Sequence, residues 1–251
     1  METMQMALQQ RAMTNVSEAV FTAKYFDPRD PVIPDLIIAA GEHDIGSDDI
    51  LACDNEQPVH KVTLPEYLFA SKMVSNAEYL GFMQADGYLR QEFWSDEGWQ
   101  WNRNCQHEAP EFWQQDGQGN WYSLSAQGQS DIDANAAVSG LSWYEADAFA
   151  RYAGCRLPHE FEWEAAMNSD SALMLSTGQA WEWCANTFFP YKGFQAFPYE
   201  RYSTPWFDSQ HYVMKGSSLY SGESVRQPSF RNFYQPTKRH VFAGLRLAQG
   251  L

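Results

Sequence analysis

The stretch Arg156-Leu-Pro-His-Glu-Phe-Glu-Trp-Glu-Ala-Ala166 determines the fold more than any other part of the sequence. Pro158 stands just ahead of a helical pattern, where a missing backbone N–H costs nothing, and a helix is predicted over Glu160–Met167. His159 occupies the N-cap position, at which histidine is a poorer acceptor than serine or threonine. The stretch therefore predicts a helix with a well-defined start and a weak cap.

Two capping boxes earlier in the sequence predict two more helices. In Ser75-Asn-Ala-Glu78 and in Ser142-Trp-Tyr-Glu145, a serine hydroxyl accepts from the third helical amide and the glutamate reaches back. The first helix is expected to run to about Ala85, and the second to about Ala153, where Gly154 ends it. About three helices are therefore predicted in all.

Short alternating apolar segments ahead of these helices predict strands. Leu36–Ala40 and Asp44–Ile45 are expected to flank a turn at Gly41-Glu42-His43, and Val59–Leu64 and Leu68–Phe69 alternate as strands do. The strands are short and close together, which favours antiparallel pairing.

The remaining sequence has little regular pattern. Residues 1–35 are interpreted as an amino-terminal extension with one short helix within Gln5–Lys24, and residues 36–251 as one domain. Residues 88–140 and 168–235 are rich in Trp, Tyr, Gly and Pro, and such long irregular segments usually form functional surface. The predicted fold class is α+β, with short antiparallel strands, about three helices and much ordered coil.

Composition and charge exclude several classes of protein. The 251 residues include 17 Lys and Arg against 32 Asp and Glu, which gives a formal net charge of −15. A non-specific nucleic-acid binder needs a basic face, and docking on an anionic membrane needs basic residues too. Aromatic residues make up 16% of the chain, which excludes a disordered acidic protein.

The cysteines and the apolar segments indicate a cytoplasmic protein. Cys53, Cys105, Cys155 and Cys184 are widely spaced with no C-x-x-C pair, so they are interpreted as reduced thiols, most of them buried. The first 30 residues have no secretory signal pattern, and no window approaches the length of a membrane-spanning helix.

Five segments in order resemble the formylglycine-generating-enzyme-like domain, also called the sulfatase-modifying-factor domain. They are Ala39–Ser47, Leu141–Ala148, Arg156–Ala166, Trp181–Trp183 and Gly244–Leu247. The resemblance covers about residues 36–248 and implies a variant of the C-type lectin fold.

Five further segments resemble the carboxy-terminal half of the ergothioneine-pathway sulfoxide synthases. The segments that carry this likeness are Asn76–Leu80, Trp94–Trp99, Pro190–Phe194, Tyr199–Ser203 and Phe230–Phe233. Those are non-haem iron enzymes that join a thiol, cysteine or γ-glutamylcysteine, to the imidazole of a histidine derivative with O2. The ovothiol and selenoneine pathways have related enzymes.

The resemblance implies the residues of a thiol-substrate site. Tyr199 and Tyr202 match a tyrosine pair of which one donates a proton, a role that suits a phenol. The substrate-binding stretch supplies Phe233, Tyr234, Lys238 and Arg239. Lys238 and Arg239 are the candidate anion clamp, and Phe233-Tyr234 in place of Trp-Asp favours cysteine over γ-glutamylcysteine. The alternative is that the tyrosines are ordinary packed residues and the two cations solvated surface charge.

Arg231 and Arg246 lie within apolar runs, so we predict structural roles with their heads paired to acidic residues. The acidic run Ser47–Glu56 is interpreted as a solvated loop.

Metal chemistry is limited by the ligands that the sequence offers. Ser224 and Ser229 stand where a formylglycine-generating enzyme has its two copper(I)-binding cysteines, so copper chemistry is not expected. The family's iron ligands come from a DinB-like helical domain, and the six histidines here include no pair at i, i+3 or i+4. Iron(II) is therefore expected only from a partner. Candidate ligands for a structural calcium ion are Asn186, Asp208 and Glu182.

The sequence thus supports two main hypotheses and a third. The first is the thiol-binding half of a sulfoxide synthase, acting on a small thiol with a separate DinB-like iron-binding subunit. The second is a non-catalytic lectin-like module that binds a ligand or a protein. The third is a complete enzyme in which histidines of this chain or of a second copy bind iron.

Overall fold

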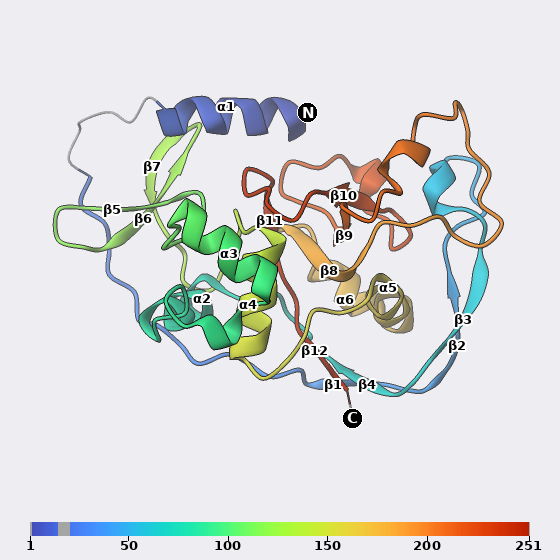
Figure 1. Cartoon of the computed structure of the whole chain (residues 1–251), viewed down its shortest axis with the longest axis horizontal. Coiled ribbons are helices and arrows are strands. Elements are labelled where there is room, and N and C mark those ends of the chain that lie inside the picture. Colours follow the sequence, from blue (N-terminus) through green and yellow to red (C-terminus); the bar gives the residue numbers. More distant parts are fainter. Residues whose placement is uncertain (1, 15–20, 251) are drawn as a thin grey trace.

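The computed structural model describes residues 2–14 and 21–250, and these mix helices with several small sheets (Figure 1). The α-helices are α1 (Glu2–Thr14), α2 (Asn76–Gln84), α3 (Asp96–Cys105), α4 (Trp143–Tyr152), α5 (Glu160–Ser169) and α6 (Ser171–Leu175). The 3₁₀ turns are η1 (Asp54–Glu56), η2 (Gln91–Phe93), η3 (Thr204–Trp206) and η4 (Glu223–Val225).

Twelve short strands form four sheets. They are β1 (Leu36–Ile38), β2 (Gly41–Ile45), β3 (His60–Leu64), β4 (Tyr67–Phe69), β5 (Trp113–Gln115), β6 (Trp121–Ser125), β7 (Gly128–Asp131), β8 (Trp181–Thr187), β9 (Tyr212–Gly216), β10 (Asn232–Tyr234), β11 (Ala243–Gly244) and β12 (Ala248–Gly250). The sheet orders are β1-β4-β12, β10-β9-β8-β11, β2-β3 and β5-β6-β7. All neighbours are antiparallel except β11 and β8.

The helix α5 joins distant parts of the chain through three glutamates at alternate positions. Glu160 pairs with Arg231 at 2.7 Å, and Glu164 pairs with Lys215 at 2.9 Å, both fully buried. Glu162 holds Arg156 through two bonds of 2.6 and 2.7 Å. The stretch 156–166 therefore binds three separate parts of the chain. These are Lys215 of β9, Arg231 just before β10, and Arg156 at the start of the stretch itself.

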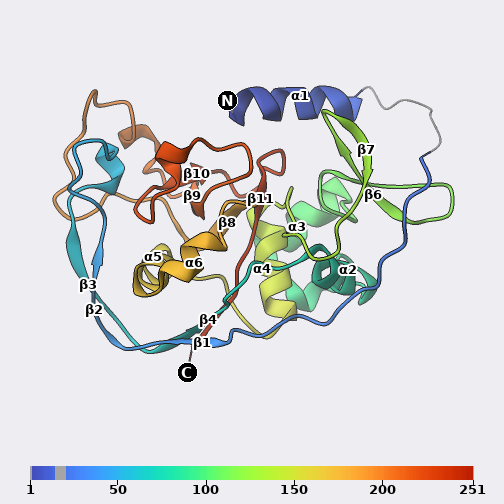
Figure 2. The same ribbon diagram turned by 180° about the vertical axis from the view of Figure 1, so that it is seen from behind.

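Two apolar clusters fill the interior on either side of the four-stranded sheet. The larger contains Tyr79, Phe82 and Phe149 from α2 and α4, and the second contains Trp163 of α5 with Phe188 and Val213. Figure 2 shows α5 and α6 grouped on one side of β8 and β9, with α2, α3 and α4 on the other. The sheet therefore holds the loops at its upper end on a rigid base.

The α+β class with small antiparallel sheets is confirmed, and so are both capping boxes and the strands ahead of α2. Gly41-Glu42-His43 is not a turn, because these residues pair with Val62–Leu64 as part of β2. His159 caps α5 after all: its Nδ1 accepts from the amide of Phe161 at 3.1 Å.

The helix count was too low, since the described residues hold six α-helices. The segments 88–140 and 168–235 also contain α3, α6 and six strands, whose short lengths left no clear period in the sequence. The amino-terminal helix ends at Thr14, residues 15–20 lie outside the described part, and residues 21–24 are not helical. The domain boundary at residue 36 stays a prediction.

Ser142→Ala is expected to lower the free energy of unfolding by about 1 kcal/mol, because its hydroxyl accepts from the Glu145 amide at 3.1 Å. Urea denaturation of the variant measures the loss. Ser125→Ala, in an exposed hairpin, is the control and should change stability by less than about 0.5 kcal/mol. Equal losses in both variants would contradict the cap's contribution.

No helix in residues 2–14 and 21–250 has the length and apolar character that crossing a membrane requires. The four cysteines are free, but only Cys184 is buried, so the prediction that most of them are buried was wrong. Cys53 and Cys155 are half-buried, and Cys105 is exposed.

Candidate functional site

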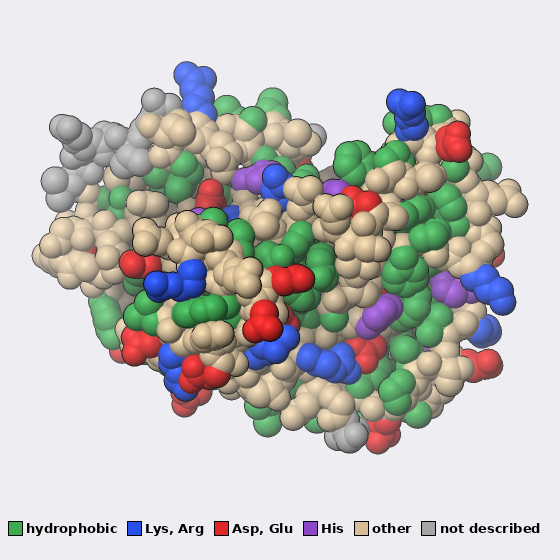
Figure 3. Space-filling model, viewed as in Figure 1, with side chains coloured by type: hydrophobic (Ala, Val, Ile, Leu, Met, Phe, Trp, Pro, Cys, Tyr) green, Lys and Arg blue, Asp and Glu red, His purple; other side chains and the backbone are tan. Residues whose placement is uncertain are grey.

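The two predicted catalytic tyrosines lie together on the connection between β8 and β9. Tyr199 is 60% exposed and Tyr202 is 39% exposed, and their ring centroids are 6.1 Å apart at an interplanar angle of 75°. Figure 3 shows a hollow at the upper edge of the molecule, between α1 and the lobe that holds this connection. The tyrosines are therefore open to a ligand or to another protein, whatever their role.

Tyr202 contacts a thiol that sequence reasoning left out of the site. Its hydroxyl lies 3.3 Å from Sγ of Cys53. Burial raises the pKa of Tyr202, and the bond to Cys53 adds to the rise. Burial also raises the pKa of the Cys53 thiol, with the carboxylates of Glu56 and Asp54 acting in the same direction. Both groups are thus protonated at neutral pH, and the raised pKa makes the phenol of Tyr202 a weaker acid than a solvated tyrosine.

The turn η1 anchors the tyrosine connection from below. Ser203 donates to Oδ1 of Asp54 at 2.5 Å, and Nδ2 of Asn55 donates to Ser203 at 3.0 Å. Glu56 accepts from Ser229 at 2.6 Å. The interpretation of Ser47–Glu56 as a solvated loop was therefore wrong for its last three residues, which are buried. The composition of the run hid this, because the partners lie far along the chain.

Phe233 is a half-buried aromatic residue of β10. It stacks on Phe188 with centroids 4.1 Å apart at 14°, and the ring of Trp206 lies 6.1 Å away. His211 is 6.1 Å from the same ring and is bonded through Nδ1 to Asp208 at 2.9 Å. We call Tyr199, Tyr202, Trp206 and Phe233 the aromatic face. The name covers two ring pairs, Tyr199 with Tyr202 and Trp206 with Phe233.

Tyr234 points to the opposite side of β10, because successive side chains of a strand alternate. Its hydroxyl contacts Sδ of Met6 on α1 at 4.0 Å, and its ring meets His240 edge-on at 6.0 Å. Burial and the nearby carboxylate of Glu2 raise the pKa of Tyr234. Phe233 and Tyr234 therefore do not face one ligand together.

Arg239 is buried inside an ion-pair cluster. Its Nε and one terminal nitrogen bind Glu145, while the other terminal nitrogen donates to Glu111 at 2.9 Å. The remaining N–H groups meet Nδ1 of His107 and the carbonyl of Ala109. All five N–H groups of this guanidinium are thus used within the protein.

Lys238, by contrast, is half-buried and forms no ion pair with the described residues. Lys238 does not line the nearby groove of about 460 Å³, whose walls include Gln235, Pro236, Thr237, Tyr144, Tyr212 and the acidic Glu97. Of the two cations predicted as an anion clamp, Lys238 alone remains free to bind a carboxylate in this conformation.

The predicted metal ligands do not form a centre. Asn186 binds Glu160, Asp208 binds His211, and Glu182 is paired with Arg246 at 2.7 Å. Within residues 2–14 and 21–250, no three His, Cys, Asp or Glu side chains are placed to hold a metal ion. The three candidate calcium ligands are thus each engaged with another side chain of the protein.

The structural predictions for Arg231 and Arg246 are confirmed, since each guanidinium is fully buried against a carboxylate. At the two positions compared with copper-binding cysteines, the hydroxyl of buried Ser229 donates to Glu56 at 2.6 Å, whereas Ser224 lies exposed in η4.

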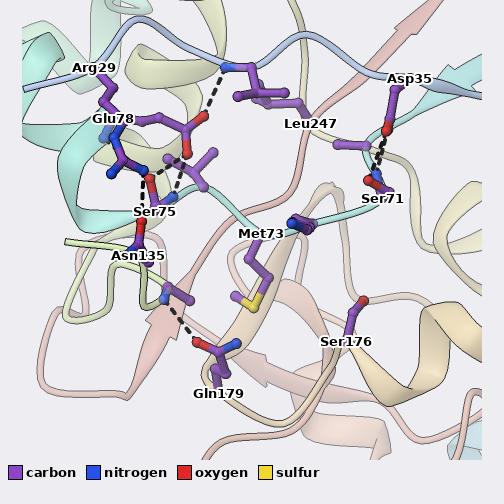
Figure 4. Close-up of a pocket in the computed structure, with 15 residues that line it drawn as sticks. Arg29, Asp35, Ser71, Met73, Ser75, Glu78, Asn135, Ser176, Gln179 and Leu247 are labelled. Carbon is purple, nitrogen blue, oxygen red and sulfur yellow. Dashed lines mark hydrogen bonds between the residues drawn. The ribbon is translucent and has the colours of Figure 1, made fainter. Parts of the chain in front are cut away.

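A separate cavity of about 520 Å³ lies between the segment before α2 and the segments around Gln179 and Leu247 (Figure 4). Its walls include Arg29, Ser75, Glu78 and Gln179, and its polar groups are largely bonded to one another. Arg29 donates to Asn135 at 2.7 Å, Glu78 accepts from Val32 and Ser75, and Gln179 accepts from Ala137. None of the predicted site residues lines it.

Cys53 is expected to react with iodoacetamide more slowly than Cys105 at about pH 8. The thiolate is the reacting species, and a raised pKa moves its formation to higher pH. Alkylation followed by peptide mass spectrometry measures both rates in one sample. Buried Cys184, whose pKa burial also raises, serves as the slowest internal reference. Faster reaction at Cys53 than at Cys105 would contradict this protonated contact with Tyr202.

Comparison with known proteins identifies related sequences along nearly the whole chain. The family model described as "Sulfatase-modifying factor enzyme 1-like domain" matches residues 23–174 and 168–251. "Hercynine oxygenase" of Mycobacterium tuberculosis is 31% identical over 246 residues, covering 80% of this chain and 57% of that protein. "Ergothioneine biosynthesis protein 1" of Schizosaccharomyces pombe is 24% identical over 230 residues, covering 79% of this chain and 27% of that protein. The chain thus spans little more than half the length of the hercynine oxygenase it matches.

Among solved structures, PvdO from Pseudomonas aeruginosa superposes with a TM-score of 0.55. The match covers 86% of this chain and 94% of that one, at 14% sequence identity, so it supports the fold alone.

Proposed function

This chain belongs to the sulfatase-modifying factor enzyme 1-like domain family, and from that premise we propose that it is the thiol-binding half of an ergothioneine-pathway sulfoxide synthase. A separate cytoplasmic polypeptide of the DinB-like type supplies the iron(II). The proposed overall reaction joins a thiol and a histidine derivative: RSH and the imidazole C–H react with O2 to give the sulfoxide R–S(O)–C and one water. The oxygen molecule is the oxidant, and both hydrogens leave in the water.

The observations that carry the proposal are two aromatic pairs: Tyr199 against Tyr202 on the exposed connection between β8 and β9, and Trp206 against Phe233 of β10. Tyr202 carries its proton beside Cys53, and its raised pKa means that it gives this proton only to a strongly basic acceptor bound next to it. Lys238, which has no ion-pair partner among residues 2–14 and 21–250, offers an ammonium for the carboxylate of a cysteine-type thiol. The exposed aromatics also suit a partner that completes the site, because aromatic side chains are enriched at interfaces.

The test is reconstitution of the full chain with an iron-binding partner captured by pull-down. We expect sulfoxide by mass spectrometry when iron(II), O2, cysteine and hercynine are supplied together. Tyr202→Phe should lower the rate by roughly a hundredfold or more. Tyr25→Phe is the matched control and should leave the rate unchanged. It alters a tyrosine elsewhere on the chain that is 65% exposed. Absence of sulfoxide with a partner that binds both iron and this chain would overturn the catalytic proposal.

The second candidate is a non-catalytic lectin-like binding module. It is favoured by the internal use of every Arg239 donor and by the seating of α1 over Tyr234. This candidate predicts binding of cysteine or another small ligand, measured by calorimetry, with no turnover in the reconstituted mixture.

A further inference from the structure

The carboxylate of Glu2, in the first turn of α1, is held by three donors from elsewhere in the chain. Nε1 of Trp181 donates to it at 2.7 Å, the hydroxyl of Ser218 at 2.7 Å, and the hydroxyl of Ser221 at 3.0 Å. Trp181 lies on β8, and the two serines lie in the loop after β9. We call these three side chains the donor cradle.

The donor cradle is oriented before any acceptor arrives. The oxygen of Ser218 accepts the amide of Tyr220 at 3.2 Å, and the oxygen of Ser221 accepts the amide of Ser218 at 3.0 Å. Each hydroxyl oxygen accepts from a backbone N–H, and its own hydrogen can point at the carboxylate or at the other serine oxygen, 3.3 Å away. The indole of Trp181 can only donate. Trp181 and Ser218 are both buried, at 2% and 0% exposure, so the geometry is set by the core.

An acceptor with two oxygens is what this arrangement requires. Without an acceptor, the buried indole N–H of Trp181 would be unpaired, which is unfavourable, whereas the two hydroxyls lie 3.3 Å apart and can bond to each other. A carboxylate has lone pairs for all three, and three neutral donors can hold it without a salt bridge. The chain supplies one from its own helix, on a side chain with a short aliphatic stem.

The same helix covers part of the predicted substrate stretch. Met6, one turn along from Glu2, contacts the hydroxyl of Tyr234. Farther along, the side-chain amide of Gln9 donates to the carbonyl of Leu124 and accepts from the amide of Ala126. Only Met6 and Gln9 of α1 are buried, while Met4 and Leu8 are exposed, so few apolar contacts hold the helix. In both Figure 1 and Figure 2, α1 lies along the outer edge of the molecule, above the hairpin of β6 and β7 and above β11.

We propose that the donor cradle is a binding site for small carboxylic acids and that α1 closes it by inserting Glu2 in place of the ligand. The ligand class is a carboxylate on a short aliphatic stem. Binding of such an acid competes with the seating of α1 and uncovers Tyr234. This goes beyond the proposed function, because it needs no thiol, iron or oxygen.

Calorimetric titration of the full chain with propionate tests the site. Glu2→Ala empties the cradle and is expected to bind propionate with a Kd of about 1–10 mM. The unaltered chain should bind at least roughly tenfold more weakly, because its site is occupied. Glu223→Ala removes an exposed acid from the same loop and should behave like the unaltered chain. Ser221→Ala added to Glu2→Ala should weaken binding by roughly tenfold; Ser221 is only half-buried, so the double variant is expected to fold.

Hydrogen exchange of the α1 amides provides the second measurement. Propionate should speed their exchange in the unaltered chain if it displaces Glu2. No binding to Glu2→Ala up to about 100 mM, binding that the Ser221 change leaves intact, or unaltered α1 exchange in saturating propionate would each overturn the proposal. Propionate binding without sulfoxide formation would instead support the cradle while the proposed function fails.

Discussion

Arg231→Met is expected to lower the free energy of unfolding by about 3–5 kcal/mol. The guanidinium forms two bonds to Glu160, of 2.7 and 2.8 Å, and donates to the carbonyls of Asn55 and Phe189. It also lies 4.1 Å from the ring centroid of Tyr191. Its removal leaves the Glu160 carboxylate buried and unpaired, and a buried charge without a partner is far more costly than a missing contact. Urea denaturation followed by tryptophan fluorescence measures the loss.

The double variant Arg231→Met with Glu160→Leu separates this cause from simple loss of packing. We expect it to recover much of the lost stability, because no charge is left buried. Lys61→Met, which breaks an exposed pair with Asp44, is the control and should cost less than about 1 kcal/mol. A double variant no more stable than Arg231→Met alone would show that the carbonyl bonds, rather than the ion pair, carry the effect.

The sequence predicted what depends on neighbours within one turn of the chain. Both serine capping boxes formed because donor and acceptor are three residues apart, so tertiary contacts hardly affect them. The family match likewise confirms the resemblance read from five ordered segments. Arg231 and Arg246 were expected to pair with acids, since a guanidinium within an apolar run has few other ways to be buried.

What could not be predicted depends on partners far along the chain. The acids of α5 face three different cations, and nothing in the spacing of Glu160, Glu162 and Glu164 says which. The side of β10 that faces the aromatic surface is set by its register against β9, so the sequence could not separate Phe233 from Tyr234. The buried end of the acidic run, Asp54-Asn-Glu56, could not be told from a solvated loop. Its partners Ser203 and Ser229 lie some 150 residues or more away in the sequence.

Arg239→Met is expected to cost about 3–5 kcal/mol of folding stability, whereas Lys238→Met should change it by less than about 0.5 kcal/mol. Arg239 neutralises Glu145, a fully buried carboxylate that also caps α4 and accepts from the hydroxyl of Tyr88 at 2.7 Å. The pKa of Arg239 is raised: burial opposes its charge, but Glu145 and Glu111 outweigh that effect. The guanidinium is thus held charged by the protein itself, with no donor left over.

Comparing variants of these two adjacent cations therefore separates a structural role from a substrate-binding role. Under the proposed function, Lys238→Met weakens cysteine binding by roughly tenfold while the protein stays fully folded, as calorimetry and denaturation would measure on the same sample. Arg239→Lys should recover part of the stability lost in Arg239→Met, because an ammonium restores the charge but not the fork of bonds. If Arg239→Met proved as stable as the unaltered chain yet bound no cysteine, the buried cluster would have to open for substrate, and the anion clamp predicted from sequence would include both residues.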